Sequence, residues 1–187
     1  MIRLIALATL LLATPAWAAW DIDQLMQGLA RSKVAHATFV EKKYIAMLDA
    51  PVTSSGELLF TAPDRLERRT LKPRAESVVL DGATMTLIRG QRQLVLSLQE
   101  HPAIGALTES IRATLAGDRP ALERHYTLKL EGSEPRWSLF LKPREARTRA
   151  FVLEIRIDGE RGEVRTVEVE QSDKDRSVMT IQKAAAP

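Results

Sequence analysis

The chain has 187 residues, of which 45% are hydrophobic and 27% are charged, enough for one domain with a buried core. Its formal net charge of +3 comes from evenly mixed acidic and basic residues, so no nucleic-acid-binding footprint is evident. The sequence contains no cysteine, which excludes disulfides and thiol chemistry.

The N-terminal segment 1–18 has the features of an export signal. Arg3 supplies a positive charge, Leu4–Leu12 is an apolar run, and Ala16–Ala18 fits the small-residue pattern of a cleavage site. The apolar run is shorter than the about 18 residues that a membrane-spanning helix needs. We therefore predict cleavage after Ala18 and a soluble periplasmic protein, with a retained N-terminal anchor as the alternative.

Three amphipathic helices are predicted, one near the N-terminus and two in the middle of the chain. The first covers 21–32, with Asp21 as N-cap and Gln24 completing a capping box. Its apolar stripe consists of Ile22, Leu25, Met26 and Leu29. The second ends at Gly117, with Glu109 and Arg112 off an apolar stripe formed by Ile104, Leu107, Ile111 and Leu115. The third covers 120–125 and can be capped by Asp118.

The rest of the chain alternates apolar and polar residues and is predicted to form about ten or eleven strands. Turns at 63–64, 73–74 and 81–82 separate the first strands, which are Gly56–Thr61, Arg65–Thr70, Glu76–Asp81 and Thr84–Arg89. Later strands carry apolar faces formed by Leu94, Leu96 and Leu98, by Trp137, Leu139 and Leu141, and by Phe151, Leu153, Ile155 and Ile157. A last strand includes Met179 and Ile181.

Short strands joined by turns predict an antiparallel sheet, and one continuous sheet of this size tends to curl. We therefore predict an α+β fold, mainly antiparallel, in which the curled sheet forms an incomplete, half-open barrel. The helices would cover its concave apolar face, because each amphipathic stripe needs an apolar surface to cover. A single domain is predicted over 19–183, with a disordered tail over 184–187.

Residues with catalytic chemistry are sparse in this sequence. His36, His101 and His125 are far apart and lack the spacing of metal ligands. The nucleophile motif G-x-S-x-G is absent, and the glycines do not form a phosphate-binding loop. We therefore expect no enzymatic activity, no metal site and no cofactor, although side chains far apart in sequence could still converge on a catalytic site.

Apolar residues give the richer functional signal, because a curled sheet with a thin helical cover leaves room for a hydrophobic ligand. We predict that the second helix forms a lid through Ile104, Leu107, Ile111 and Leu115. The residues predicted to line the cavity are Met85, Leu87, Leu94, Leu96, Leu98, Trp137, Leu139, Phe151, Leu153 and Ile155. Each of these could instead be an ordinary core residue.

The densest basic cluster of the chain consists of Arg65, Arg68, Arg69, Lys72 and Arg74. One interpretation is a solvated strand edge and turn. The other is a docking patch, centred on Arg65, Arg68 and Arg69, for an acidic partner or an anionic headgroup.

Three short motifs point to a known family. They are F-V-E-K at Phe39–Lys42, S-S-G-E-L-L-F-T-A-P at Ser54–Pro63, and V-V-L-D-G at Val78–Gly82. With the signal and the first helix, they make the chain resemble the periplasmic LolA-like carriers of outer-membrane lipoproteins. The resemblance implies an incomplete β-barrel closed by a helical lid, with a cavity for the acyl chains of a lipoprotein. It also implies loading by an inner-membrane transporter, delivery to an outer-membrane acceptor, and no cofactor.

Two departures from the family pattern mark this chain as a divergent member. Ala62 stands where the family often has a basic residue, before a proline, that is implicated in lid closure. The segment after the Asp81–Gly82 turn, 83–88, has no aromatic residue, although family members are usually aromatic there. We expect a monomeric carrier for lipoproteins or other acylated molecules, with a protein-interaction module or an enzyme on the same scaffold as alternatives.

Overall fold

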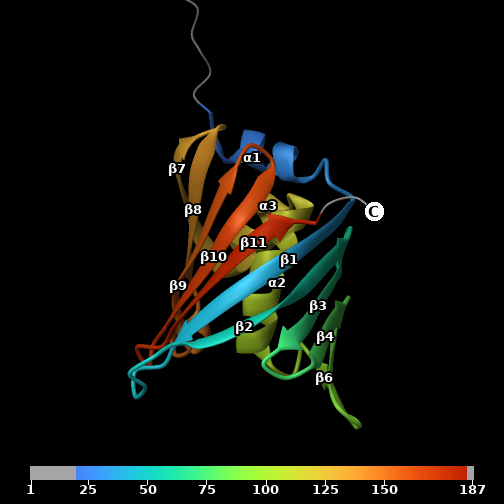
Figure 1. The fold of residues 1–187 in the computed structure, drawn as a ribbon. Coiled ribbons are helices and arrows are strands. Elements are labelled where there is room, and N and C mark those ends of the chain that lie inside the picture. The colour runs from blue at the N-terminus through green and yellow to red at the C-terminus, as the bar shows by residue number, and fades with distance from the viewer. Residues whose placement is uncertain (1–19, 185–187) are drawn as a thin grey trace, which may run out of the picture.

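The computed structural model describes residues 20–184 (Figure 1). The predicted signal peptide over 1–18 and residues 185–187 of the predicted tail lie outside the described residues. Ala184, the first residue of that predicted tail, still donates its backbone N–H to the carbonyl of His36 at 3.0 Å. The last strand is therefore tied to the sheet up to this residue.

One antiparallel sheet of eleven strands forms the body of the molecule. The strands follow the order β6-β5-β4-β3-β2-β1-β11-β10-β9-β8-β7, and within residues 20–184 the edges β6 and β7 are not joined to each other. The predicted α+β fold with an incomplete barrel is confirmed. The strands are β1 Val34–Tyr44, β2 Val52–Thr61, β3 Arg65–Lys72, β4 Glu76–Asp81, β5 Thr84–Arg89, β6 Arg92–Ser97, β7 Tyr126–Ser133, β8 Arg136–Pro143, β9 Val152–Glu160, β10 Glu163–Gln171 and β11 Arg176–Lys183.

In the part of the chain that the structure describes, four helices accompany the sheet: α1 Ile22–Leu29, α2 Pro102–Ala116, α3 Arg119–His125 and α4 Ala146–Arg149. The predicted capping box of α1 is present, with the Asp21 carboxylate and the Gln24 side chain bonding to each other's backbone N–H groups. Gly117 ends α2 in the left-handed conformation with φ of 69°. The single turn α4 lies in a segment whose charged sequence did not predict a helix.

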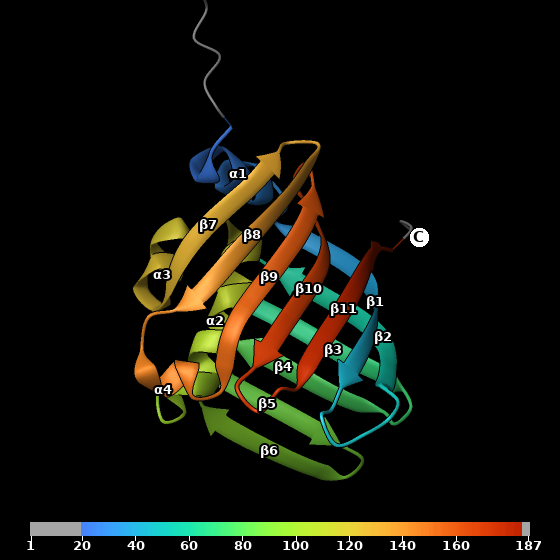
Figure 2. The same ribbon diagram turned by 90° about the vertical axis from the view of Figure 1, so that its left-hand side faces the viewer.

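The helices lie on the concave side of the sheet, and α2 runs between β7–β9 on one side and β3–β6 on the other (Figures 1 and 2). The buried core lies between α1–α3 and strands β7–β10. Its largest side chain, Trp137, is 1% exposed and donates its indole N–H to the carbonyl of Arg161 at 2.7 Å. Other members of this core are Leu25, Met26, Leu29, Leu122, Tyr126, Leu139, Leu141, Ile155 and Ile157.

Among residues 20–184, none of the helices combines the length and the apolar character that crossing a membrane would require.

Candidate functional site

A continuous apolar surface follows from the strand register on the concave side of β2–β6. Residues that pair across antiparallel strands lie on the same face of the sheet. One row of such pairs consists of Phe60, Leu66, Leu80, Met85 and Leu96, and the next row consists of Leu58, Arg68, Val78, Leu87 and Leu94. These ten side chains are called the concave patch below.

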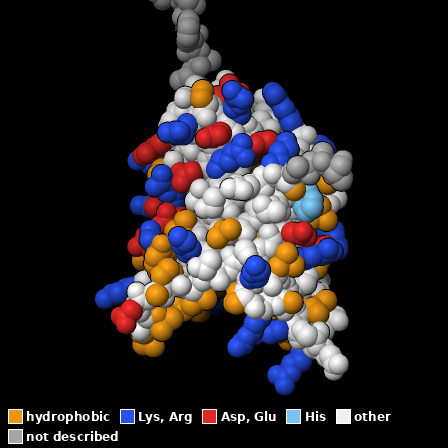
Figure 3. Space-filling view, viewed as in Figure 1, with side chains coloured by type: hydrophobic (Ala, Val, Ile, Leu, Met, Phe, Trp, Pro, Cys, Tyr) orange, Lys and Arg blue, Asp and Glu red, His pale blue; other side chains and the backbone are white. Residues whose placement is uncertain are grey.

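The concave patch is less completely covered than the core under α1–α3. Phe60 and Leu80 are buried, most of the others are half-buried, and Leu94 at the edge of the sheet is 49% exposed. None of these side chains belongs to the core between the helices and β7–β10. Figure 3 shows hydrophobic side chains beside a hollow in the lower edge of the molecule. The patch is therefore an apolar surface that the helices cover incompletely.

Helix α2 lies on the same side of the sheet as this surface, and its predicted stripe of large apolar residues is divided between the core and a more exposed side of the helix (Figures 1 and 2). The face of α2 that packs into the core carries small side chains instead, among them Ala106, Ser110 and Ala113. Successive residues of a helix are rotated by about 100° around its axis. By this rotation, Ile104 and Leu115 project from a side of α2 that lies between its core-facing side and the side that carries Arg112. Ile104 is 38% exposed and Leu115 is half-buried, whereas Leu107 and Ile111 pack partly against the core.

The predicted cavity residues divide into two groups in the structure. Met85, Leu87, Leu94 and Leu96 lie in the concave patch, and Leu98 lies just after β6 beside Gly105 of α2. Trp137, Leu139 and Ile155 are instead at most 1% exposed and fill the core under the helices. The predicted cavity residues of β5 and β6 thus lie together on a partly exposed surface, whereas Trp137, Leu139 and Ile155 form packed interior.

Phe151 and Leu153 were predicted to share a cavity-lining face with Ile155, and this prediction is wrong. In the pairing of β9 with β10, Val152 and Glu154 face consecutive residues of the partner strand, so Leu153 is an unpaired extra residue. Such a bulge shifts the alternation of side chains by one position. Val152 is therefore buried, while Phe151 and Leu153 are 61% and 47% exposed.

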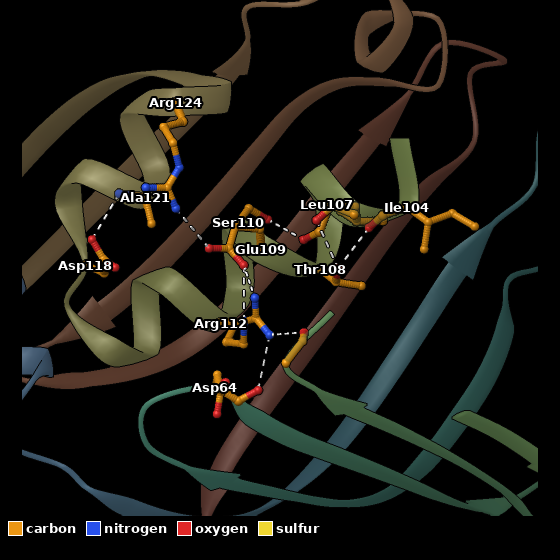
Figure 4. A network of polar contacts seen from close by, with 12 residues as sticks. Asp64, Ile104, Leu107, Thr108, Glu109, Ser110, Arg112, Asp118, Ala121 and Arg124 are labelled. Atoms are coloured by element: carbon orange, nitrogen blue, oxygen red, sulfur yellow. Dashed lines mark hydrogen bonds and ion pairs between the residues drawn. The ribbon is translucent and has the colours of Figure 1, made fainter. Parts of the chain in front are cut away.

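Arg112 ties α2 to the rim of the sheet (Figure 4). Its Nη1 donates to the carbonyl of Gly82 at 2.5 Å and to the carbonyl of Asp64 at 3.3 Å. These carbonyls lie in the β4–β5 and β2–β3 turns. The guanidinium also pairs with Glu109 of α2, which lies 3.7 Å from Arg124 of α3. One half-buried arginine thus connects the helical cover to both turns.

The contact between Arg112 and the turn shows how α2 can be joined to the sheet although Ala62 stands in place of a basic residue. The resemblance implied a basic residue of the sheet at this turn as the element that holds the lid, and Ala62 cannot form such a bond. In this structure Asp64, two residues further along the same turn, accepts a hydrogen bond from Arg112 of α2. The basic partner between helix and turn is supplied by the helix.

The basic cluster predicted as one docking patch is split between the two faces of the sheet, so that prediction is wrong in its geometry. Arg65 and Arg69 lie on the convex face, where they pair with Asp81 and Glu67, both at 2.6 Å. Arg68 points the other way, into the concave patch between Leu58 and Val78. The three arginines therefore offer no common surface to a single partner.

Arg68 belongs to a small polar cluster inside the apolar concave side. Its Nη2 donates to Glu41 Oε2 at 2.5 Å and lies 3.4 Å from Ser54 Oγ, which in turn lies 3.3 Å from the same carboxylate oxygen. The guanidinium carbon lies 4.7 Å from the ring centre of Phe39, whose side chain is buried. Within residues 20–184, the Nε of Arg68 is enclosed and has no hydrogen-bond partner.

Two pockets lie away from the concave patch. A cleft of about 770 Å³ separates α1 from the β7–β8 and β9–β10 turns, and polar residues such as Gln24, Arg31, Glu134 and Arg165 line it. A smaller pocket of about 230 Å³ lies on the convex face and includes His36, Glu57 and Arg69. Neither contains a residue that the sequence predicted for the cavity.

Glu41, Ser54 and Arg112 were not predicted as site residues. Glu41 and Ser54 meet Arg68 only through the pairing of β1, β2 and β3, which no local pattern shows. The sequence pattern put Arg112 outside the apolar stripe of α2. This position was the only feature of the sequence that indicated a contact of Arg112 with something other than the core.

The sequence comparison identifies the family of this fold. Residues 13–186 match the family described as outer membrane lipoprotein carrier protein LolA-like. The chain belongs to this LolA-like family. No curated protein matches the chain. The resemblance that the three short motifs indicated is therefore confirmed.

Solved structures similar to this LolA-like chain share little sequence with it. A DUF1329 family protein from Desulfovibrio piger is 13% identical, with 87% of this chain and 89% of that chain covered and a TM-score of 0.51. A LolA superfamily protein from Nitrosomonas europaea is 11% identical, with 89% and 93% covered and a TM-score of 0.47. The MucA/MucB complex structure from Pseudomonas aeruginosa contains a chain that is 16% identical, with 89% and 58% covered and a TM-score of 0.47. The low identities confirm that this LolA-like chain is divergent.

Proposed function

We propose that this protein is a periplasmic carrier that binds the acyl chains of lipoproteins, or of other acylated molecules, against the concave patch. The observation that carries the proposal is the incompletely covered apolar patch on β2–β6, on the side of the sheet where α2 also leaves Ile104 exposed. Family membership supports the same role, because the family description names carriers of outer-membrane lipoproteins.

The energetics of such a carrier follow from apolar burial. Removing an acyl chain from water contributes about 0.8 kcal/mol for each buried CH₂ group. A chain of ordinary length can therefore be held firmly if α2 moves away from the sheet and then covers the ligand. The bonds of Arg112 to the Gly82 and Asp64 carbonyls would have to break during that movement.

In this role the protein takes its load from an inner-membrane transporter and passes it to an outer-membrane acceptor. It works as a monomer, by binding rather than by catalysis, and needs no cofactor. An enzyme on the same scaffold is the second candidate from the sequence, but no specific contact in the described residues favours it.

Native mass spectrometry of protein purified gently from the periplasm, with lipid extraction of the same sample, tests the proposal. We expect a bound acylated species, whose extracted lipid gives the class of cargo. An unliganded mass that also stays unchanged after lipids and acylated peptides are added would contradict the carrier role.

A further inference from the structure

The polar cluster of Glu41, Ser54 and Arg68 is not needed to hold the sheet together. The backbone ladders of β1, β2 and β3 pair these strands along their length without it. The Arg68 and Glu41 side chains are 31% and 18% exposed, so this partly buried ion pair carries a desolvation cost that reduces what the attraction between its charges contributes. An apolar residue in place of Arg68 would continue the row from Leu58 to Val78. We therefore consider a role of this polar cluster in binding the ligand.

Arg68 has hydrogen-bonding capacity that its protein partners do not use. A guanidinium carries five N–H donors, and the contacts with Glu41 and Ser54 both involve Nη2. The Nε–H has no acceptor within the described residues. The guanidinium carbon lies over the ring of Phe39. Because the Nε–H is enclosed, a ligand that lies along the concave patch would meet the guanidinium at Nη1, which makes no hydrogen bond within the described residues, on a side chain that is 31% exposed.

The charge balance of the cluster selects the kind of acceptor. Glu41 already neutralises Arg68, and its carboxylate lies within hydrogen-bond distance of the guanidinium. An anionic group on the ligand would be attracted by the Arg68 guanidinium, but the nearby Glu41 carboxylate would repel it across a short distance. An uncharged carbonyl oxygen accepts from the guanidinium without that repulsion.

We infer that Glu41, Ser54 and Arg68 form the subsite that recognises the ester or amide carbonyl where an acyl chain joins its headgroup. This inference rests on the proposed function and adds the ligand class: acyl esters and amides, in preference to hydrocarbons and free fatty acids. The apolar rows on either side of Arg68 take the chain, and Arg68 fixes where the chain ends.

Displacement of the neutral dye Nile red from the full-length mature protein tests the subsite. The competitors are methyl laurate, dodecane and laurate, which share a chain length and differ in the polar end. Because a hydrogen bond to a charged donor is worth about tenfold in affinity or somewhat more, methyl laurate should displace the dye at about tenfold lower concentration than dodecane. Laurate should be weaker than methyl laurate.

Two variants separate the subsite from general apolar binding. Arg68→Met should remove the advantage of methyl laurate over dodecane and keep the affinity for dodecane. Arg69→Met is the matched control, because Arg69 is the next residue of β3 and lies on the convex face. It should keep the wild-type order of competitors. Circular dichroism and the thermal midpoint check that each variant is folded.

Glu41→Gln gives a second test that does not depend on the folding of Arg68→Met. It removes the charge that neutralises Arg68, so laurate should bind more tightly relative to methyl laurate than it does in the wild type. Equal displacement by methyl laurate and dodecane in the wild type, or an unchanged laurate preference in Glu41→Gln, would overturn the subsite alone. Failure of the wild type to bind Nile red or any competitor would instead overturn the proposed carrier function itself.

Discussion

Tyr126 shows how a single buried side chain affects the stability of this protein. It is 1% exposed at the junction of α3 and β7, and its hydroxyl is enclosed beside Ser110, whose own hydroxyl donates to the carbonyl of Leu107. Burial raises the pKa of the Tyr126 phenol from 10.0 to about 12. Because burial disfavours the phenolate, the folded protein keeps this proton at pH values where the unfolded chain releases it.

The free energy of unfolding should therefore depend on Tyr126 above pH 10. Below the unfolded pKa both states hold the proton and the full stability is present. Between pH 10 and 12 the unfolded state loses its proton first, so the stability should fall by up to about 3 kcal/mol. Tyr126→Phe should remove this fall and change stability at neutral pH by no more than about 1 kcal/mol.

Urea unfolding at pH 8, 10 and 11.5, followed by circular dichroism, would measure this difference between wild type and Tyr126→Phe. The chain has two tyrosines, so Tyr44→Phe is a natural control and should keep the wild-type fall. Parallel curves for wild type and Tyr126→Phe across this range would show that the phenol does not contribute as described.

At the scale of elements, α2 has two different neighbours. Small residues pack it onto the core under α1 and α3, and Arg112 connects it to the turns of the β2–β5 region. The first contact is apolar and extensive, whereas the second consists of two hydrogen bonds from one side chain. We therefore expect α2 to separate from the sheet rim more easily than from the core.

Arg112→Met should loosen α2 without unfolding the molecule. Loss of two charge-assisted bonds should make amide hydrogen exchange in α2 about tenfold to hundredfold faster, because local opening needs less free energy. Exchange in β8 and β9 should stay at the wild-type rate. Arg124→Met, which removes an exposed arginine at 3.7 Å from Glu109, is the control and should change little. Equal acceleration in α2 and β8 would mean that Arg112 stabilises the whole fold rather than the cover.

Local patterns allowed much of the fold to be predicted. The capping box of α1, the strand boundaries of β4 and β5 and the helix stop at Gly117 all depend on residues a few positions apart, and all are present. The bulge at Leu153 was missed because strict alternation of apolar residues cannot show that one residue lacks a cross-strand partner.

The candidate site was only partly predictable, for a related reason. Arg68 reaches Glu41 across 27 positions, and Arg112 reaches the Gly82 carbonyl across 30. Such contacts depend on the order of the strands in the sheet. Several arginines in one strand suggest a single basic patch, although alternate residues of a strand face opposite sides of the sheet. The packed core around Trp137 was likewise indistinguishable from a cavity wall, since both require the same alternating apolar residues.

In the whole molecule, the two halves of the single sheet differ in how completely the helices cover them. Its β7–β10 half is covered by helices and forms the stable core, while its β2–β6 half leaves an apolar surface incompletely covered. A stable half and an open half are what a carrier requires, because cargo must enter and leave without unfolding the protein. The proposed carrier function requires that acyl chains bind to the open half.

Photo-cross-linking can locate a bound acyl chain on the sheet. A long-chain acyl ester with a diazirine midway along the chain would be bound to the protein, irradiated, and located by peptide mass spectrometry. We predict cross-links to Leu58 and Leu87 of the concave patch and to Ile104 of α2, and none to Val95, which lies on the convex face of β6. Cross-links confined to convex residues, or to the polar cleft beside α1, would contradict the proposed carrier function.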